Sequence, residues 1–95
     1  MTLLYNQLPQ LDLHGIDRDY ARILINDFIR DNYVLQIEKV IIIHGIGTGI
    51  TRKTTQETLK KNKLVVDYKI DNFNPGMTVV KIDKKHWHIN HFMLG

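Results

Sequence analysis

A run of four β-branched apolar residues constrains the fold of this chain more than any other feature; it comprises Val40, Ile41, Ile42 and Ile43. It belongs to a segment at 37–43 that predicts a strand with two apolar faces, as in a central strand covered on both sides or a parallel strand. The run is far shorter than the ~20 residues of a membrane-spanning helix. A loop with three glycines, 45–49, follows it, and only glycine-rich backbone can make such a turn. The chain is therefore expected to fold around a buried strand that ends in a glycine-rich loop.

The patterns on either side of this strand predict the element order β-α-β-α-β-β. The expected elements are strands at 10–13, 37–43, 64–70 and 77–82, and helices that run from an N-cap at Asp17 to about Tyr33 and over about 50–62. The turn Pro75-Gly76 separates the last two strands and favours their antiparallel pairing. This order predicts an α/β two-layer sandwich with a mixed four-stranded sheet.

The two helices differ in how well they fit an amphipathic pattern. The first has apolar residues at a 3.6-residue period, with Ile25 on the flank of the stripe. The stripe consists of Tyr20, Ala21, Leu24, Phe28 and Ile29. The second helix has threonine at 51, 54, 55 and 58, which leaves Ile50 and Leu59 as its apolar anchors. Because threonine is a poor helix former, this helix is expected to depend on packing and on its entry loop.

The composition indicates one ordinary globular domain. Ninety-five residues, with 43% apolar and 24% charged side chains, suffice for one two-layer core. We divide the chain into a lead-in at 1–10, a domain at 11–82 and a histidine-rich extension at 83–95. The absence of cysteine excludes disulfides and thiol nucleophiles. A secretory signal would be indicated by a basic stretch followed by an apolar core, and the start of the sequence shows no such pattern. We therefore expect a cytoplasmic location without a membrane partner.

Positive charge is concentrated in the second half of the chain. Residues 1–44 carry a net charge of −2, and residues 45–95 carry a net charge of +5. Most of the excess comes from Arg52, Lys53, Lys60, Lys61 and Lys63. A basic face of this kind suits a polyanion, above all a phosphate backbone; the alternative is an ordinary solvated helix surface.

Two histidine–glycine turns follow the first two predicted strands. His14 and Gly15 end the first strand, and His44 and Gly45 end the second. Ligands bind open α/β sheets at the carboxyl ends of the strands. If these strands are parallel neighbours, both imidazoles reach the same edge, within reach of one phosphate. Asp12 shares the face of His14 and is expected to orient a histidine or hold a cation; the alternative is that it satisfies the turn.

The glycine-rich loop matches neither of the two common nucleotide-binding fingerprints. A Walker A loop counted from Gly45 needs its second glycine at position 50, which is Ile50. The dinucleotide-binding fingerprint needs its third glycine at the same position and fails for the same reason. Backbone N–H groups and a helix N-terminus still favour an anion, and Arg52 can clamp it. The predicted phosphate-binding residues are Gly45, Gly47, Gly49, Arg52 and Lys53. A tight structural turn is the alternative, and Thr48 is expected to cap the following helix.

The tail contains three histidines, which are His86, His88 and His91. No carboxylate or cysteine stands beside them to complete a metal site, so no metal is predicted there. Trp87 and Phe92 are expected instead to pack on the domain or on a partner.

These residues together resemble the Smr (small MutS-related) domain family. Its signatures LDLHG and HGxGxGxLR are similar to residues 11–15 and 44–52, and its closing G-x-T-x-V strand is similar to residues 76–80. The resemblance covers about 11–82 and implies the same β-α-β-α-β-β fold. It places the functional positions of the family on Asp12, His14, His44, Gly45, Gly47 and Arg52. Thr51 replaces the family's leucine before the arginine, and Ile46 stands where the family often has lysine or arginine.

The resemblance implies a nucleic-acid function, since Smr domains are associated with nicking of DNA and cleavage of RNA, including ribosome-associated messages. We therefore predict an endonuclease in which His14 and His44 share acid–base work, while Asp12 orients a histidine or holds Mg²⁺ or Mn²⁺. Metal is dispensable if RNA supplies its 2′-hydroxyl as the nucleophile. The alternatives are a module that binds DNA, RNA or the ribosome without cleavage, and a protein adaptor that uses the tail. The oligomeric state is left open.

Overall fold

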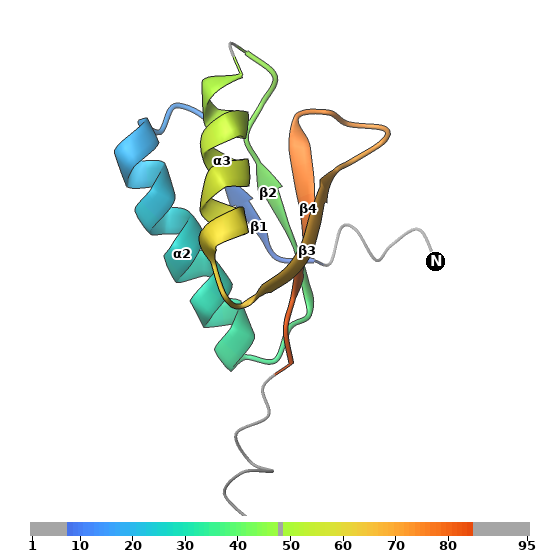
Figure 1. Cartoon of the computed structure of the whole chain (residues 1–95). Coiled ribbons are helices and arrows are strands. Elements are labelled where there is room, and N and C mark those ends of the chain that lie inside the picture. Colours follow the sequence, from blue (N-terminus) through green and yellow to red (C-terminus); the bar gives the residue numbers. More distant parts are fainter. Residues whose placement is uncertain (1–7, 48, 85–95) are drawn as a thin grey trace, which may run out of the picture.

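The β-branched run forms β2, an inner strand of a four-stranded sheet with the order β1-β2-β4-β3 (Figure 1). The computed structural model describes residues 8–47 and 49–84. Its elements are β1 (Gln10–Asp12), α2 (Arg18–Val34), β2 (Lys39–Ile43), α3 (Ile50–Lys61), β3 (Val65–Ile70) and β4 (Met77–Ile82). β1 and β2 are parallel, whereas β4 is antiparallel to both of its neighbours. The predicted two-layer sandwich with a mixed sheet is confirmed.

Both helices cover the same face of the sheet (Figure 1). On this face Val40 and Ile42 of β2 belong to the hydrophobic core. The other buried members of the core are Leu13, Ala21, Ile25, Ile29, Leu59, Val80 and Ile82. Because side chains alternate along a strand, Ile41 lies on the opposite face, where it is also fully buried. β2 is therefore apolar on both faces, as its sequence predicted.

α2 begins where the sequence predicted, but its buried face is rotated. The carboxylate of Asp17 accepts a hydrogen bond from the backbone N–H of Tyr20 at 2.9 Å and caps the helix. Ile25, which was predicted on the flank, is fully buried, whereas Tyr20 is 51% exposed. The buried stripe follows an i, i+4 row through Ala21, Ile25 and Ile29, and this row faces the sheet.

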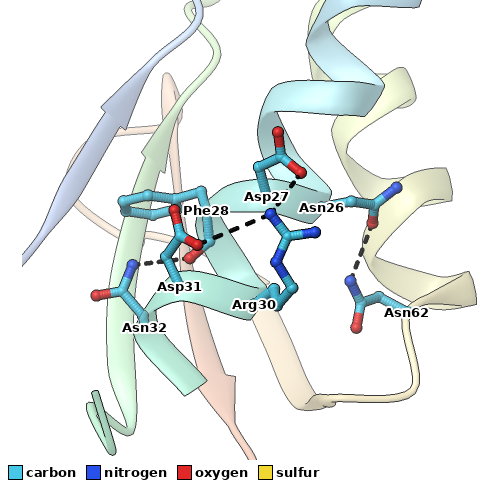
Figure 2. A network of polar contacts seen from close by, with 7 residues as sticks. All are labelled: Asn26, Asp27, Phe28, Arg30, Asp31, Asn32 and Asn62. Atoms are coloured by element: carbon cyan, nitrogen blue, oxygen red, sulfur yellow. Dashed lines mark hydrogen bonds and ion pairs between the residues drawn. The ribbon is translucent and has the colours of Figure 1, made fainter. Parts of the chain in front are cut away.

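The second half of α2 makes several polar contacts within the helix and one to the end of α3 (Figure 2). The buried Asn32 donates from Nδ2 to the carbonyl oxygen of Phe28 at 2.8 Å. Asn62, which follows α3, donates from Nδ2 to Oδ1 of Asn26 at 2.9 Å and ties the end of α3 to α2. The exposed Arg30 also forms ion pairs with two aspartates of the same helix, and such pairs contribute little stability.

Threonine side chains form much of the buried face of α3. The buried threonines are Thr54, Thr55 and Thr58. The hydroxyl groups of Thr55 and Thr58 each donate to the carbonyl oxygen one turn earlier at 2.8 Å, which offsets the cost of burying them. Leu59 is buried as predicted. The prediction that Ile50 anchors the helix is wrong, because its side chain is 56% exposed and lines a hollow between the helices.

Some predictions lie outside the described residues. They concern the cap by Thr48 and the tail residues His86, Trp87, His88, His91 and Phe92. The N-cap position of α3 is Gly49. Within the described part of the chain, no helix has the length and apolar character needed to cross a membrane.

Candidate functional site

The two histidine–glycine turns lie side by side at one edge of the sheet. Because β1 and β2 are parallel, Asp12 pairs with Ile43, and the backbone N–H of Leu13 donates to the carbonyl oxygen of Ile43 at 2.8 Å. His44 directly follows Ile43, and His14 lies two residues after Asp12. Both helices also begin at this end of the sheet (Figure 1). The carboxyl ends of two parallel strands and the N-termini of two helices therefore meet here, where α/β sheets bind ligands.

The imidazole of His44 is buried beneath the glycine-rich turn, with only 5% of the residue exposed. Its Nδ1 lies 2.9 Å from the carbonyl oxygen of Gly45, and its Nε2 lies 2.8 Å from Oγ1 of Thr78 on β4. Since a carbonyl oxygen can only accept, Nδ1 carries the proton, and the neutral ring accepts at Nε2 from the threonine hydroxyl. The ring therefore connects the loop after β2 to β4.

Burial also determines the charge of His44. Desolvation lowers the pKa of its imidazole below the usual 6.5; the hydrogen bond to Gly45 opposes this shift, and the nearby guanidinium of Arg52 adds to it. His44 is consequently neutral near pH 7, and both of its ring nitrogens are occupied by protein groups. This environment favours a positioning role over proton transfer.

His14 occupies the equivalent position in the other turn and is exposed. Its backbone N–H donates to Oδ1 of Asp12 at 2.9 Å, which is the turn-satisfying contact that the sequence allowed for this aspartate. Gly15 continues the turn with a φ of +75°. Within residues 8–47 and 49–84, no side chain forms a hydrogen bond with the His14 ring. The imidazole is therefore accessible to a ligand.

The first part of the glycine-rich loop is held by the loop between β3 and β4. The backbone N–H groups of His44 and Gly45 donate to the carbonyl oxygen of Gly76 at 3.0 and 2.9 Å. Gly76 is buried, and a Cβ atom there would lie 3.2 Å from Oδ1 of Asn74 and 3.5 Å from Cα of Gly45. Contrary to the prediction, the N–H of Gly45 is thus already bonded within the protein and not free for a phosphate. Gly45 instead shapes the turn with a φ of +77°.

The second part of the loop is open to an anion. Gly47 is exposed, and Gly49 is the N-cap of α3, where a glycine supplies no side chain to the helix end. Nη2 of Arg52 lies 3.6 Å from the position that a Cβ atom on Gly49 would occupy, so its guanidinium folds back beside the loop. Arg52 forms no ion pair with any described residue. The positive end of a helix and an unpaired guanidinium therefore coincide here, and both favour an anion.

Two adjoining hollows that share Glu57 lie between α2 and α3, and together they form what we call the basic hollow. One part, of about 250 Å³, is lined by Arg18 and Lys53 among others, and a second part, of about 240 Å³, is lined by Arg22 and Lys61. Glu57 contributes to both parts. The walls thus contain four cationic side chains from two helices against one carboxylate, although Arg22 also pairs with an aspartate one turn earlier at 2.8 Å.

Three residues of this region were not predicted from the sequence. Arg18 and Arg22 lie in the half of the chain with negative net charge, which concealed their contribution to a basic surface. Their spacing of four residues on a helix was the available signal. Thr78 was part of a recognised motif, but its contact with His44 joins residues 34 positions apart. A polar residue at an inward position of an apolar strand was the only hint of it.

A divalent cation would find few protein ligands at this edge. In the parts of the chain that the structure describes, no group of three His, Cys, Asp or Glu side chains could hold a metal ion. The carboxylate of Asp12 is present, with one oxygen bonded to the N–H of His14. Mg²⁺ often binds through one or two carboxylates together with substrate phosphate oxygens. The residues therefore fit a cation that is shared with a bound phosphate, and not a complete protein site.

The fold and this edge define a small α/β domain whose open turn, helix N-terminus and arginine suit an anionic ligand. A family model described as the Smr domain matches residues 11–83. The Endonuclease MutS2 of Clostridium kluyveri is 38% identical over 72 residues, which are 76% of this chain and 9% of that protein. The Endonuclease MutS2 of Clostridioides difficile is 32% identical over 76 residues, which are 77% of this chain and 10% of that protein. The chain belongs to the Smr domain family and spans about a tenth of the length of these relatives.

Two solved structures have the same fold. The Smr domain of Thermus thermophilus MutS2 aligns with a TM-score of 0.76 at 24% identity and covers 79% of this chain and 98% of that chain. YdaL, a stand-alone small MutS-related protein from Escherichia coli, aligns with a TM-score of 0.76 at 23% identity and covers 82% of this chain and 66% of that chain. The family resemblance inferred from the two histidine–glycine motifs is confirmed.

Proposed function

We propose that this domain binds a nucleic-acid strand at the loop edge of the sheet and cleaves a phosphodiester bond there. The observation that carries the proposal is that the exposed His14 follows β1 while the open loop with Arg52 follows β2, the neighbouring parallel strand. The name Endonuclease MutS2 of the relatives points in the same direction. The proposal assigns nuclease activity to the part of the chain that these relatives share with it.

In this proposal His14 transfers protons and the loop stabilises charge. An imidazole near neutral pH can take a proton from the attacking hydroxyl or water, or give one to the leaving oxygen. Arg52 and the backbone at Gly47 and Gly49 stabilise the negative charge that develops on the phosphate. Asp12 fixes the turn that presents His14, and its carboxylate can share a cation with the bound phosphate.

His44 acts in this proposal as a positioning residue. Its buried ring holds the carbonyl of Gly45 on one side and the hydroxyl of Thr78 on the other. The same turn is fixed by Gly76 through two backbone hydrogen bonds. The loop is therefore rigid at its first residues and open at its later ones, which is the arrangement that preorganised charge stabilisation requires.

The decisive experiment is a cleavage assay with analysis of the product ends. Labelled single strands and duplexes of DNA and RNA are incubated with the wild type and with His14→Ala, in EDTA, Mg²⁺ or Mn²⁺. We expect cleavage by the wild type and its loss in the variant. A cyclic phosphate end would identify attack by the RNA 2′-hydroxyl, whereas attack by water leaves no cyclic end. Failure of the wild type to cleave any of these substrates would contradict the proposal.

We propose that the hollow between α2 and α3 carries the phosphate backbone away from the loop. Replacing Arg22 and Lys61 by glutamine should weaken binding of a nucleic-acid strand and flatten its salt dependence, since each lost phosphate contact changes the log–log slope by about 0.7–0.9. The matched control replaces Lys39 and Lys81, an exposed cross-strand pair of the sheet, by glutamine. Equal losses in both double variants would show that only the total charge matters.

One observation favours a second candidate, a module that binds DNA, structured RNA or the ribosome without cleaving it. Phosphodiester hydrolysis uses both a base and an acid, whereas the described residues place only one accessible imidazole, that of His14, at this edge. Such a module would bind in a salt-sensitive manner, its affinity would survive His14→Ala, and it would yield no product in the assay above.

A further inference from the structure

The loop between β3 and β4 presents the most exposed large apolar side chain among the described residues. Phe73 is 95% exposed, so its ring gains almost nothing from the hydrophobic core. Single exposed apolar residues are common and need no function by themselves. Phe73 differs from them in two respects, which are how it is held and where it lies.

Hydrogen bonds within the loop hold Phe73 in this exposed position. Oδ2 of Asp71 accepts from the backbone N–H groups of Phe73 and Asn74 at 3.0 and 2.9 Å. Oδ1 of Asn74 accepts from the N–H of Gly76 at 3.0 Å. Two backbone hydrogen bonds close the loop: the N–H of Asp71 donates to the carbonyl oxygen of Met77 at 3.0 Å, and the N–H of Met77 donates to that of Asn74 at 3.1 Å. The aromatic ring is thus presented by a preordered segment, which reduces the entropy lost on binding.

The same loop touches the glycine-rich turn. The carbonyl of Gly76 accepts from the N–H groups of both His44 and Gly45. Phe73 precedes Gly76 by three residues, which limits the separation of their Cα atoms to about 11 Å. The loop also lies at the same end of the sheet as the two histidine turns (Figure 1). Because a stacked strand rises about 3.4 Å per nucleotide, a base a few nucleotides from a phosphate at the turn can reach the ring.

We propose that Phe73 stacks on an unpaired base of the strand whose phosphate lies at the glycine-rich turn. This inference rests on the proposed function and specifies its substrate class, which is a single strand or an unpaired loop and not a fully paired duplex. Inside a duplex the faces of each base are covered by its neighbours. An exposed aromatic ring beside a phosphate site offers an unpaired base a stacking surface that tolerates any sequence.

Binding measurements with and without bases test the inference. Fluorescence anisotropy gives the affinity for a labelled single strand, for an abasic strand of equal length and charge, and for a blunt duplex. Phe73→Ala should weaken binding of the base-containing single strand roughly 5- to 150-fold, as expected for one stacked base, and leave the abasic strand unchanged. Phe73→Trp should retain the wild-type affinity. The matched control is Leu35→Ala, which removes a 68% exposed apolar side chain at the C-cap of α2 and should change nothing.

A fluorescence measurement provides a second readout of the contact. The chain has a single tryptophan, Trp87, so Phe73→Trp is combined with Trp87→Phe. The base-containing strand should quench the new indole, and the abasic strand should leave it unquenched. The stacking contact is overturned if Phe73→Ala loses equal affinity for both strands, or if it loses no affinity while the wild type binds. Either result leaves the cleavage proposal standing. A wild type that binds none of these ligands contradicts both.

Discussion

The two histidine–glycine turns occupy equivalent places in the chain but differ in the surroundings of their imidazoles. His14 follows β1 and is exposed, whereas His44 follows β2 and is 5% exposed. The difference follows from the sheet order, because β1 is an edge strand and β2 is an inner one. The inner position places β4 beside β2, and Thr78 of β4 receives the ring of His44.

This comparison shows that a repeated motif need not repeat its chemistry. An accessible imidazole can exchange protons with a substrate, while an enclosed and neutral one serves to hold the backbone around it. We therefore expect replacement of the His14 side chain to affect activity, and replacement of the His44 side chain or of its partner Thr78 to affect stability.

The largest expected effect is the loss of activity in His14→Ala. If His14 transfers a proton in the reaction, cleavage should slow about 10²- to 10⁴-fold. The free energy of unfolding should change by less than about 0.5 kcal/mol, because the side chain is exposed. Single-turnover cleavage and urea unfolding measure the two quantities. The roles assigned to the two histidines are wrong if this variant cleaves at the wild-type rate while a correctly folded His44→Ala variant is inactive.

The next effect concerns the partner of His44. Thr78→Val keeps the shape of the side chain but leaves the buried Nε2 of His44 without its hydroxyl, which should lower the free energy of unfolding by about 1–3 kcal/mol. Thr78→Ser retains the hydroxyl and is the matched control. Urea denaturation of both variants gives the difference. Equal stability of the valine and serine variants would show that this hydrogen bond does not hold the turn.

Alanine substitutions at the first glycine of each turn provide a smaller and more specific comparison. Gly15 and Gly45 have φ values of +75° and +77°, and a Cβ atom on either would meet nothing within 4 Å. Each variant should therefore lose about 1–2 kcal/mol through backbone strain alone. Thermal unfolding should give similar losses for both. A much larger loss for Gly45→Ala would show that the second turn is also constrained by its contact with Gly76.

The smallest effect is a dependence of stability on pH that comes from His44. Its pKa in the folded protein is lowered below 6.5, so the unfolded chain binds this proton first as the pH falls. The contribution is complete above about pH 6.5 and is lost below it, with a slope of at most about 1.4 kcal/mol per pH unit for one proton. Urea midpoints at pH 7.5 and 5.5 measure it. His44→Gln should remove the slope and His14→Gln should preserve it; the reverse result would exchange the roles of the two residues.

Much of this molecule was predictable because its signals are local. The β-branched run indicated an apolar strand, Asp17 indicated the start of a helix, and the Pro75-Gly76 turn indicated a hairpin. Each of these depends on the preferences of neighbouring residues for one backbone conformation. The element order and the places of both histidine motifs therefore followed from the sequence alone, and with them the family.

Other properties were decided only when distant segments came together. The burial of His44 depends on Thr78, and the bonded N–H of Gly45 depends on Gly76. The buried threonine face of α3 and the basic hollow likewise depend on how α3 packs beside α2. A side chain is buried or accessible according to which neighbours surround it in space, and local sequence periodicity carries no record of those neighbours.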